Sequence, residues 1–189
     1  MKIGRLLLRL SVGGFFIGHG TQKLFGWFGG HGLDATAQAF EQMGLRPGKR
    51  NAIAAGAAEA GGGALLGLGL ATPLAGAALT GTMLTAIHRV HAKNGPWAAN
   101  GGYEYNVVLI AAVLTLVEVG PGKPSLDAAL GRERSGPGLA LAALLAGAAG
   151  AVGAHYAAAA TAPAQAEAPA PAATTNSSES AVEQEVPTS

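Results

Sequence analysis

A small set of ionisable and amide side chains lies within otherwise apolar stretches of this chain. The set consists of His19, Gln22, Lys23, Glu59, His88, Arg89, His91 and Glu104. A charged side chain at the centre of a bilayer costs about 2.5–3.5 kcal/mol on insertion scales, so such residues are functional candidates by default. Imidazole, carboxylate and guanidinium groups in apolar surroundings can bond to carbonyl oxygens and move protons.

Glu59 is the charged residue least able to reach water or lipid headgroups, because it lies deep in an apolar stretch and its side chain is short. We expect its partner to be His19 or Arg89. Two interpretations stay open: a structural ion pair that holds helices together, or a catalytic or proton-carrying group. Two interpretations also stay open for Lys23: it belongs to the polar cluster, or its long side chain reaches the lipid headgroups.

His88 and His91 stand three residues apart, which places two imidazoles on one face of a helix. With carboxylates nearby, such a pair suits zinc, iron or copper. No second pair of strong ligands is visible, so hydrogen-bonded membrane histidines are the favoured interpretation and no metal site is predicted. Glu104 has the simpler interpretation of complementing a helix dipole.

The composition indicates a membrane protein. Hydrophobic residues make up 49% of the chain and charged residues 12%, about half the charged share of an average soluble domain. The net charge of +1 provides no basic field for nucleic acid. The absence of cysteine excludes disulfides, iron–sulfur ligation and thiolate zinc sites. Redox chemistry would therefore need a bound cofactor or a partner protein.

Several apolar segments approach the roughly 20 residues that a membrane-spanning helix needs. Four of them cover residues 3–25, 51–70, 74–91 and 103–119, and a fifth, rich in alanine, covers 139–160. Residues 33–43 are apolar on one face only, which predicts a helix lying at the membrane surface. A signal peptide is the alternative for the first segment, but no small-residue cleavage motif follows it.

The sequence thus predicts an all-α, polytopic membrane helix bundle. Residues 1–130 would form a four-helix transmembrane core, and residues 131–160 a charged loop and a fifth transmembrane helix. Residues 161–189 would form a disordered tail of Ala, Pro, Ser, Thr and Glu. The pairs Gly14/Gly18 and Gly63/Gly67 permit close helix packing, within the chain first and between two copies second.

The polar residues are predicted to gather in one half of the bilayer. Consecutive spans alternate in direction, so we call the end that holds the N-terminus the near end and the opposite one the far end. At 1.5 Å per helical residue, His19, Glu59, His88 and Glu104 all fall in the far half. The aromatic residues expected at the same end are Trp27, Phe28, Trp97, Tyr103 and Tyr105.

Several motifs carry a family resemblance. The run Phe15-Phe16-Ile17-Gly18-His19-Gly20-Thr21-Gln22-Lys23-Leu24-Phe25-Gly26-Trp27 resembles the first-helix signature of DoxX-like membrane proteins. Residues 100–106 and 120–127 resemble the last core helix of that family and its end. Glu59 and His88 stand where family members carry polar residues. The resemblance covers about residues 1–130, and the fifth segment and the tail are additions to it.

The resemblance implies a small integral membrane protein with a four-helix core. Relatives are linked to quinone-coupled sulfur oxidation and to membrane complexes that handle oxidative stress. The lack of cysteine argues against thiol or sulfur relay by this chain itself. A quinone stays the candidate ligand, because His, Glu and Arg among apolar helices can bond its carbonyls and move its protons.

Three functions stay open. The first is a membrane subunit of a redox complex, with a reactive cluster of His19, Glu59, His88 and Arg89 and a quinone pocket completed by Gln22, Lys23, His91 and Glu104. The second is a non-enzymatic scaffold, and the third a small-solute or proton carrier. The expected partners are the lipid bilayer, redox proteins and a second copy of the chain. The expected location is the cell membrane, in a bacterium the plasma membrane, with multiple passes.

Overall fold

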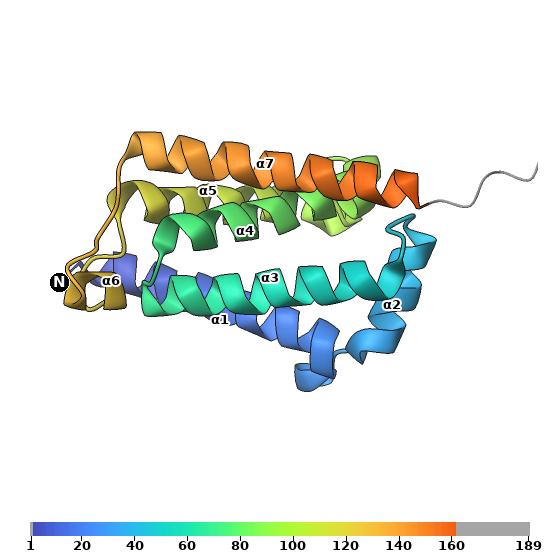
Figure 1. The fold of residues 1–189 in the computed structure, drawn as a ribbon, viewed down its shortest axis with the longest axis horizontal. Coiled ribbons are helices and arrows are strands. Elements are labelled where there is room, and N and C mark those ends of the chain that lie inside the picture. Colours follow the sequence, from blue (N-terminus) through green and yellow to red (C-terminus); the bar gives the residue numbers. More distant parts are fainter. Residues whose placement is uncertain (1, 162–189) are drawn as a thin grey trace, which may run out of the picture.

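The computed structural model describes residues 2–161, and within them every regular element is helical (Figure 1). The α-helices are α1 (Ile3–Phe25), α2 (Gly32–Gln42), α3 (Gly48–Leu68), α4 (Thr72–Ala86), α5 (Glu104–Val119), α6 (Leu126–Ala129) and α7 (Pro137–Ala160). A π-helical turn, η2 (Ile87–His91), continues α4, and the short 3₁₀ turns are η1 (Trp27–Gly29), η3 (Ala92–Asn94) and η4 (Ala98–Asn100). The all-α prediction is confirmed for this part of the chain.

The long helices form two layers (Figure 1). Antiparallel α1 and α3 make one layer, and α4, α5 and α7 make the other. The helix α2 crosses the far end of the bundle, as predicted for a short helix that does not span. The N-terminus and α6 lie together at the near end.

Local signals set the helix ends close to the predicted ones. Gly26 ends α1 in the left-handed conformation, with φ of 73°, where a residue with a Cβ would be strained. Pro73 lies in the first turn of α4, where its missing N–H costs nothing. The predicted span 51–70 lies two to three residues late, because the helix begins directly after Pro47.

Glycines bring α1 and α3 into backbone contact. A Cβ added to Gly13 would lie 2.7 Å from the Gly63 carbonyl oxygen, and one added to Gly20 would overlap Ala60. The prediction for Gly63 is therefore confirmed as intramolecular packing. For Gly14 and Gly18 the predicted packing within the chain was wrong, because no atom lies within 4 Å of a Cβ built on either, and packing between two copies stays a prediction. The face of α1 that contacts α3 carries Gly13 and Gly20 rather than Gly14 and Gly18.

The apolar core lies between the two layers. Its largest fully buried side chains are apolar and come from α1, α3, α4 and α5: Phe16, Leu66, Leu79, Val113 and Leu116. These residues hold the near half of the bundle together, where α3 and α4 are adjacent in sequence.

Buried polar residues close the near end. Arg9, 3% exposed, donates to the carbonyl oxygens of Gly67, Pro121 and Pro124 at 3.1, 2.7 and 2.5 Å. Asp127, 5% exposed, accepts from the backbone N–H of Ala71 at 3.1 Å, next to the first turn of α4. Neither residue is among the candidate residues that the sequence singles out. The structure buries both, and α6 was not predicted.

The described residues contain one helix that is long and apolar enough to cross a membrane, α7. The multi-pass expectation for the other spans is not confirmed by this criterion, for identifiable reasons. Charged side chains lower the hydropathy of α1 and α3, while α4 and α5 contain only 15 and 16 residues. The predicted tail lies outside the described residues, and the proposed domain boundaries stay predictions.

Candidate functional site

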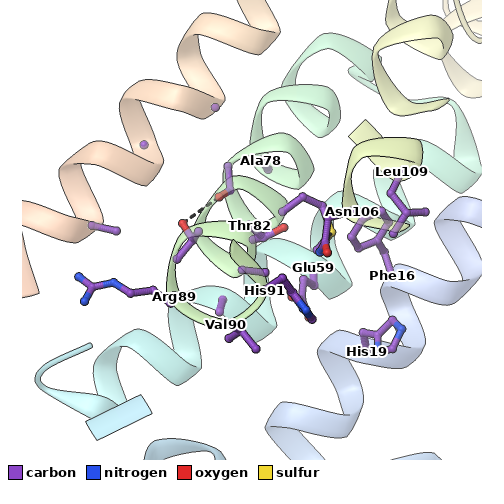
Figure 2. A pocket seen from close by; sticks show the side chains of 18 of the residues that line it. Phe16, His19, Glu59, Ala78, Thr82, Arg89, Val90, His91, Asn106 and Leu109 are labelled. Atoms are coloured by element: carbon purple, nitrogen blue, oxygen red, sulfur yellow. Dashed lines mark hydrogen bonds between the residues drawn. The ribbon is translucent and has the colours of Figure 1, made fainter. Parts of the chain in front are cut away.

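A cavity of about 820 Å³ lies between the two layers of the bundle (Figure 2). It occupies mainly the far half and extends along α4 to Leu74, near the start of that helix. α4 diverges from α3 toward the far end (Figure 1), and the cavity occupies the space between them. Side chains of α1, α3, α4, α5 and α7 form its walls, and Phe40 and Met43 close its far side.

The cavity is mainly apolar, with polar groups concentrated toward the far end. Its ionisable and amide lining residues are His19, Lys23, Asn51, Glu59, Arg89, His91, Tyr105 and Asn106. Exposed apolar residues lie at its edges: Phe15 on α1, 62% exposed, and Leu74 on α4, 63% exposed. The cavity is therefore accessible from the sides of the bundle.

Glu59 forms an ion pair with Lys23. The Lys23 Nζ lies 2.5 Å from Glu59 Oε2, and the side chains are 26% and 6% exposed. The prediction of His19 or Arg89 as the partner was wrong. His19 and Glu59 lie at similar depth, but Lys23, one turn further along α1, extends back past His19, whose carbonyl oxygen it also contacts at 3.4 Å. Its long apolar stem makes this reach favourable.

His19 is exposed and lines the cavity from α1 (Figure 2), one helical turn before Lys23. Its Nδ1 lies 3.2 Å from Gln22 Oε1. Gln22 does not line this cavity. It borders a smaller hollow on the outside of α1 and donates to the Phe28 carbonyl oxygen at 3.3 Å.

The π-helical turn points its side chains in different directions. His91 faces the cavity, with Nδ1 2.7 Å from the Gly101 carbonyl oxygen. Arg89 lines the opposite side of the cavity, toward α7, and its Nη2 lies 2.9 Å from His155 Nδ1. His88 is exposed and its ring meets that of His155 edge-on, with centroids 5.1 Å apart. The structure thus separates His88 and Arg89 from the ion pair. π-helical turns are frequent at functional sites.

Glu104 does not line the cavity. Its Oε1 accepts a hydrogen bond of 2.9 Å from the backbone N–H of Ala98, so it orders the loop before α5. Sequence reasoning missed Asn106, which is buried in the cavity wall and donates to Met83 Sδ at 3.4 Å. An amide within the apolar stretch after Glu104 was the signal. It also missed His155 as the partner of Arg89.

Within residues 2–161, no group of three or more His, Asp and Glu side chains is arranged to hold a metal ion. The chemistry that the site offers is hydrogen bonding and proton transfer. A cation and a carboxylate stand at the wall of an apolar space, with two imidazoles and an amide on neighbouring helices. Such a wall can orient a largely apolar molecule that carries hydrogen-bond acceptors.

The fold and the cavity define the class: a helical bundle that contains a mainly apolar cavity, with a buried carboxylate paired to a partly exposed lysine at its wall. The chain belongs to the DoxX family. The family model matches residues 4–92, which carry His19, Lys23, Glu59, Arg89 and His91. One relative, "Putative oxidoreductase CatD" of Bacillus subtilis (strain 168), is 35% identical over 115 residues, covering 61% of this chain and 79% of that protein. No solved structure matches the chain.

The comparisons confirm the family that the motifs of the first helix indicate. The matched residues end at 92, so the resemblance of residues 100–106 and 120–127 to the last core helix stays a prediction.

Proposed function

We propose that this protein is a multi-pass membrane protein in which α1, α3, α4, α5 and α7 all lie in the bilayer. The outer faces of these helices carry large exposed apolar side chains, among them Leu7, Phe15, Ile53, Val108 and Leu145, all at least 44% exposed. Monomeric soluble proteins rarely display so many along every face. The turn η2 lengthens α4 toward a full span.

Within this frame we propose that the cavity binds a quinone and that the protein is a membrane subunit of a redox or oxidative-stress complex. The observation that carries the proposal is the Lys23–Glu59 ion pair at the wall of a cavity of about 820 Å³. A buried ion pair costs desolvation free energy, and packed apolar residues would often replace it without loss of stability. Its presence beside an apolar cavity supports a role in ligand chemistry. The name of the Bacillus subtilis relative agrees with a redox role.

The lining residues fit the chemistry of a quinone. The apolar walls suit its ring and isoprenoid chain, and donors near the polar end suit its carbonyl oxygens. When bound, a quinone would supply the acceptor for two electrons from a redox partner and two protons from solvent. Lys23 and His91 would hold and orient a carbonyl oxygen, and Asn106 can donate to the same side of the cavity. Glu59 and the exposed His19 would carry protons between this oxygen and solvent.

The test is analysis of the protein purified in mild detergent for co-purifying quinone, haem and metal, by mass spectrometry and visible spectroscopy. We expect bound quinone in the wild type and its loss in Glu59→Gln with helix content unchanged. Glu104→Gln is the matched control, because this carboxylate orders a loop and does not line the cavity.

Other outcomes point to the alternative functions. A stable protein with no quinone in either form, even after quinone is added back, contradicts the proposal and favours a non-enzymatic scaffold. Proton or solute movement across reconstituted vesicles without a redox partner, abolished in Glu59→Gln, would instead identify a carrier.

A further inference from the structure

Arg89 carries a charge that no carboxylate compensates within the described residues. The ion pairs found there join Lys23 to Glu59, Arg46 to Glu41 and Lys49 to Asp34. Arg89 instead donates to two neutral acceptors, the Met43 carbonyl oxygen at 3.3 Å and His155 Nδ1 at 2.9 Å. Arginine stays protonated in proteins, so the charge persists. The two hydrogen bonds of Arg89 to described residues leave further guanidinium N–H groups that can bind an anion.

The neighbours of Arg89 add donors rather than acceptors. Because the guanidinium has no lone pair to offer, His155 Nδ1 must accept, and the proton of the neutral ring is then on Nε2. His88, packed edge-on against His155, is exposed and offers a further ring nitrogen. The three side chains, which we call the Arg89 cluster, therefore have an excess of hydrogen-bond donors and a positive charge.

An apolar channel, the part of the cavity that α4 and α7 line, leads away from the Arg89 cluster. It lies beside the contact between these two helices, because Gly81 and Gly147 bring their backbones together. The wall of the channel is formed by small side chains, including Ala78 and Gly81 on α4 and Gly150 and Ala154 on α7. It reaches the exposed Leu74, so it is open to the side of the bundle. The cavity of about 820 Å³ provides the space for an unbranched hydrocarbon chain, and the small residues of this wall do not project into it.

We propose that the Arg89 cluster binds the head of an anionic phospholipid whose acyl chain lies in this channel. The inference rests on the membrane placement proposed above. The planar fork of an arginine matches a phosphate, and the cluster lies at the far end of α4, where lipid headgroups would be. A headgroup with net negative charge compensates Arg89, which neither a zwitterionic lipid nor a neutral quinone does. The lipid site and the ion pair occupy different walls of the cavity.

The experiment is native mass spectrometry of the full-length protein in detergent with equimolar phosphatidylglycerol and phosphatidylcholine. We expect the wild type to retain phosphatidylglycerol with about a fivefold preference, the size of one net hydrogen bond of about 1 kcal/mol, because its headgroup would bond directly to the Arg89 guanidinium. In Arg89→Gln the preference should fall to about one. Lys93→Gln, which removes a charge from an exposed residue at the same end, should keep the wild-type ratio.

A second variant keeps the experiment decisive when the first one misfolds. If Arg89→Gln does not fold, Arg89→Lys keeps the charge without the fork, and the preference should fall below that of the wild type. Equal retention of the two lipids by the wild type, or an unchanged preference in the variant, would overturn the proposal. Stabilisation of lipid-free wild type by inorganic phosphate, with no lipid preference, would also overturn it and indicate a soluble anion.

The failure of this inference is distinguishable from failure of the proposed function. Retention of no lipid of either kind would count against membrane placement itself. Loss of quinone in Glu59→Gln with an unchanged lipid ratio would separate the two ligands.

Discussion

Lys23 Nζ and Glu59 Oε2 lie 2.5 Å apart although 36 residues separate them in the chain. The pair joins α1 to α3 at the depth where the cavity begins. Removing one partner leaves the other charge at the cavity wall, whereas removing both leaves apolar packing. The effects of substituting Lys23 and Glu59 on the free energy of unfolding should therefore be non-additive. The two side chains also act together in the proposed chemistry.

We expect Lys23→Met to lower the free energy of unfolding by about 3 kcal/mol, because Glu59 would be buried without a partner. The double variant Lys23→Met/Glu59→Leu should recover most of that loss. Thermal unfolding in detergent measures both. Lys49→Met is the control, since its pair with Asp34 is exposed and should contribute less than about 1 kcal/mol. Additive single and double effects would contradict the coupling.

The α1–α3 contact predicts opposite effects for two adjacent glycines. Gly13→Ala places a methyl group against the α3 backbone and should cost about 2 kcal/mol. Gly14→Ala meets open space and should be neutral or stabilise the helix by up to about 1 kcal/mol. Unfolding temperatures of the two variants under the same conditions test the packing. Equal destabilisation would show that the face of α1 is assigned incorrectly.

Thr80 is fully buried and its hydroxyl has no hydrogen-bond partner among the described residues. Thr80→Val should therefore stabilise the protein by about 1 kcal/mol, since an unsatisfied buried hydroxyl is removed with little change of shape. Thr82 provides the comparison, because its hydroxyl donates to the Leu79 carbonyl oxygen at 2.9 Å. Thr82→Val should not stabilise. A loss of stability in Thr80→Val would indicate an unseen partner, such as water.

We expect substitution of Asp127, at the near end, to lower the stability of the protein strongly. Asp127→Ala should cost about 2 kcal/mol, because it removes a charged acceptor from the backbone N–H groups of Ala71 and Thr72. Glu133→Ala, an exposed carboxylate six residues later, should change stability by less than about 0.5 kcal/mol. Chemical denaturation compares them, and similar values for the two would argue against a capping role.

The aromatic residues of the far end should lie at the level of the lipid headgroups if the bundle spans a bilayer. Trp27 and Trp97 are both exposed and lie at that end. Interfacial tryptophans should be quenched more strongly by lipids brominated near the headgroup than near the chain end. Single-tryptophan variants, Trp27→Phe and Trp97→Phe, should give the same order of quenching. The reverse order in either would contradict the proposed placement.

Helix positions could be predicted from the sequence because their signals are local. Gly26 and Pro73 fix the ends of α1 and α4 through backbone geometry alone. The concentration of polar residues in the far half followed from counting residues along each span, and the cavity lining agrees with it for His19, Lys23 and Glu59.

The pairing of side chains could not be predicted, because depth along a helix does not give direction around it. His19 and Lys23 differ by one turn, and only the reach of the lysine chain decides which of them meets Glu59. The π turn shifts the direction of Arg89 toward α7, a change that residue counting does not reveal. The burial of Arg9 depends on loop carbonyls more than 100 residues away in sequence.

The closed near end has a consequence for the direction of any reaction. Arg9 and Asp127 fill that end with polar groups bonded to the backbone, while the ionisable residues that line the cavity come from the far half. In a bilayer, protons taken up or released in the cavity would therefore be exchanged with a single compartment. The asymmetry of the bundle would confine proton uptake and release to one side of the membrane.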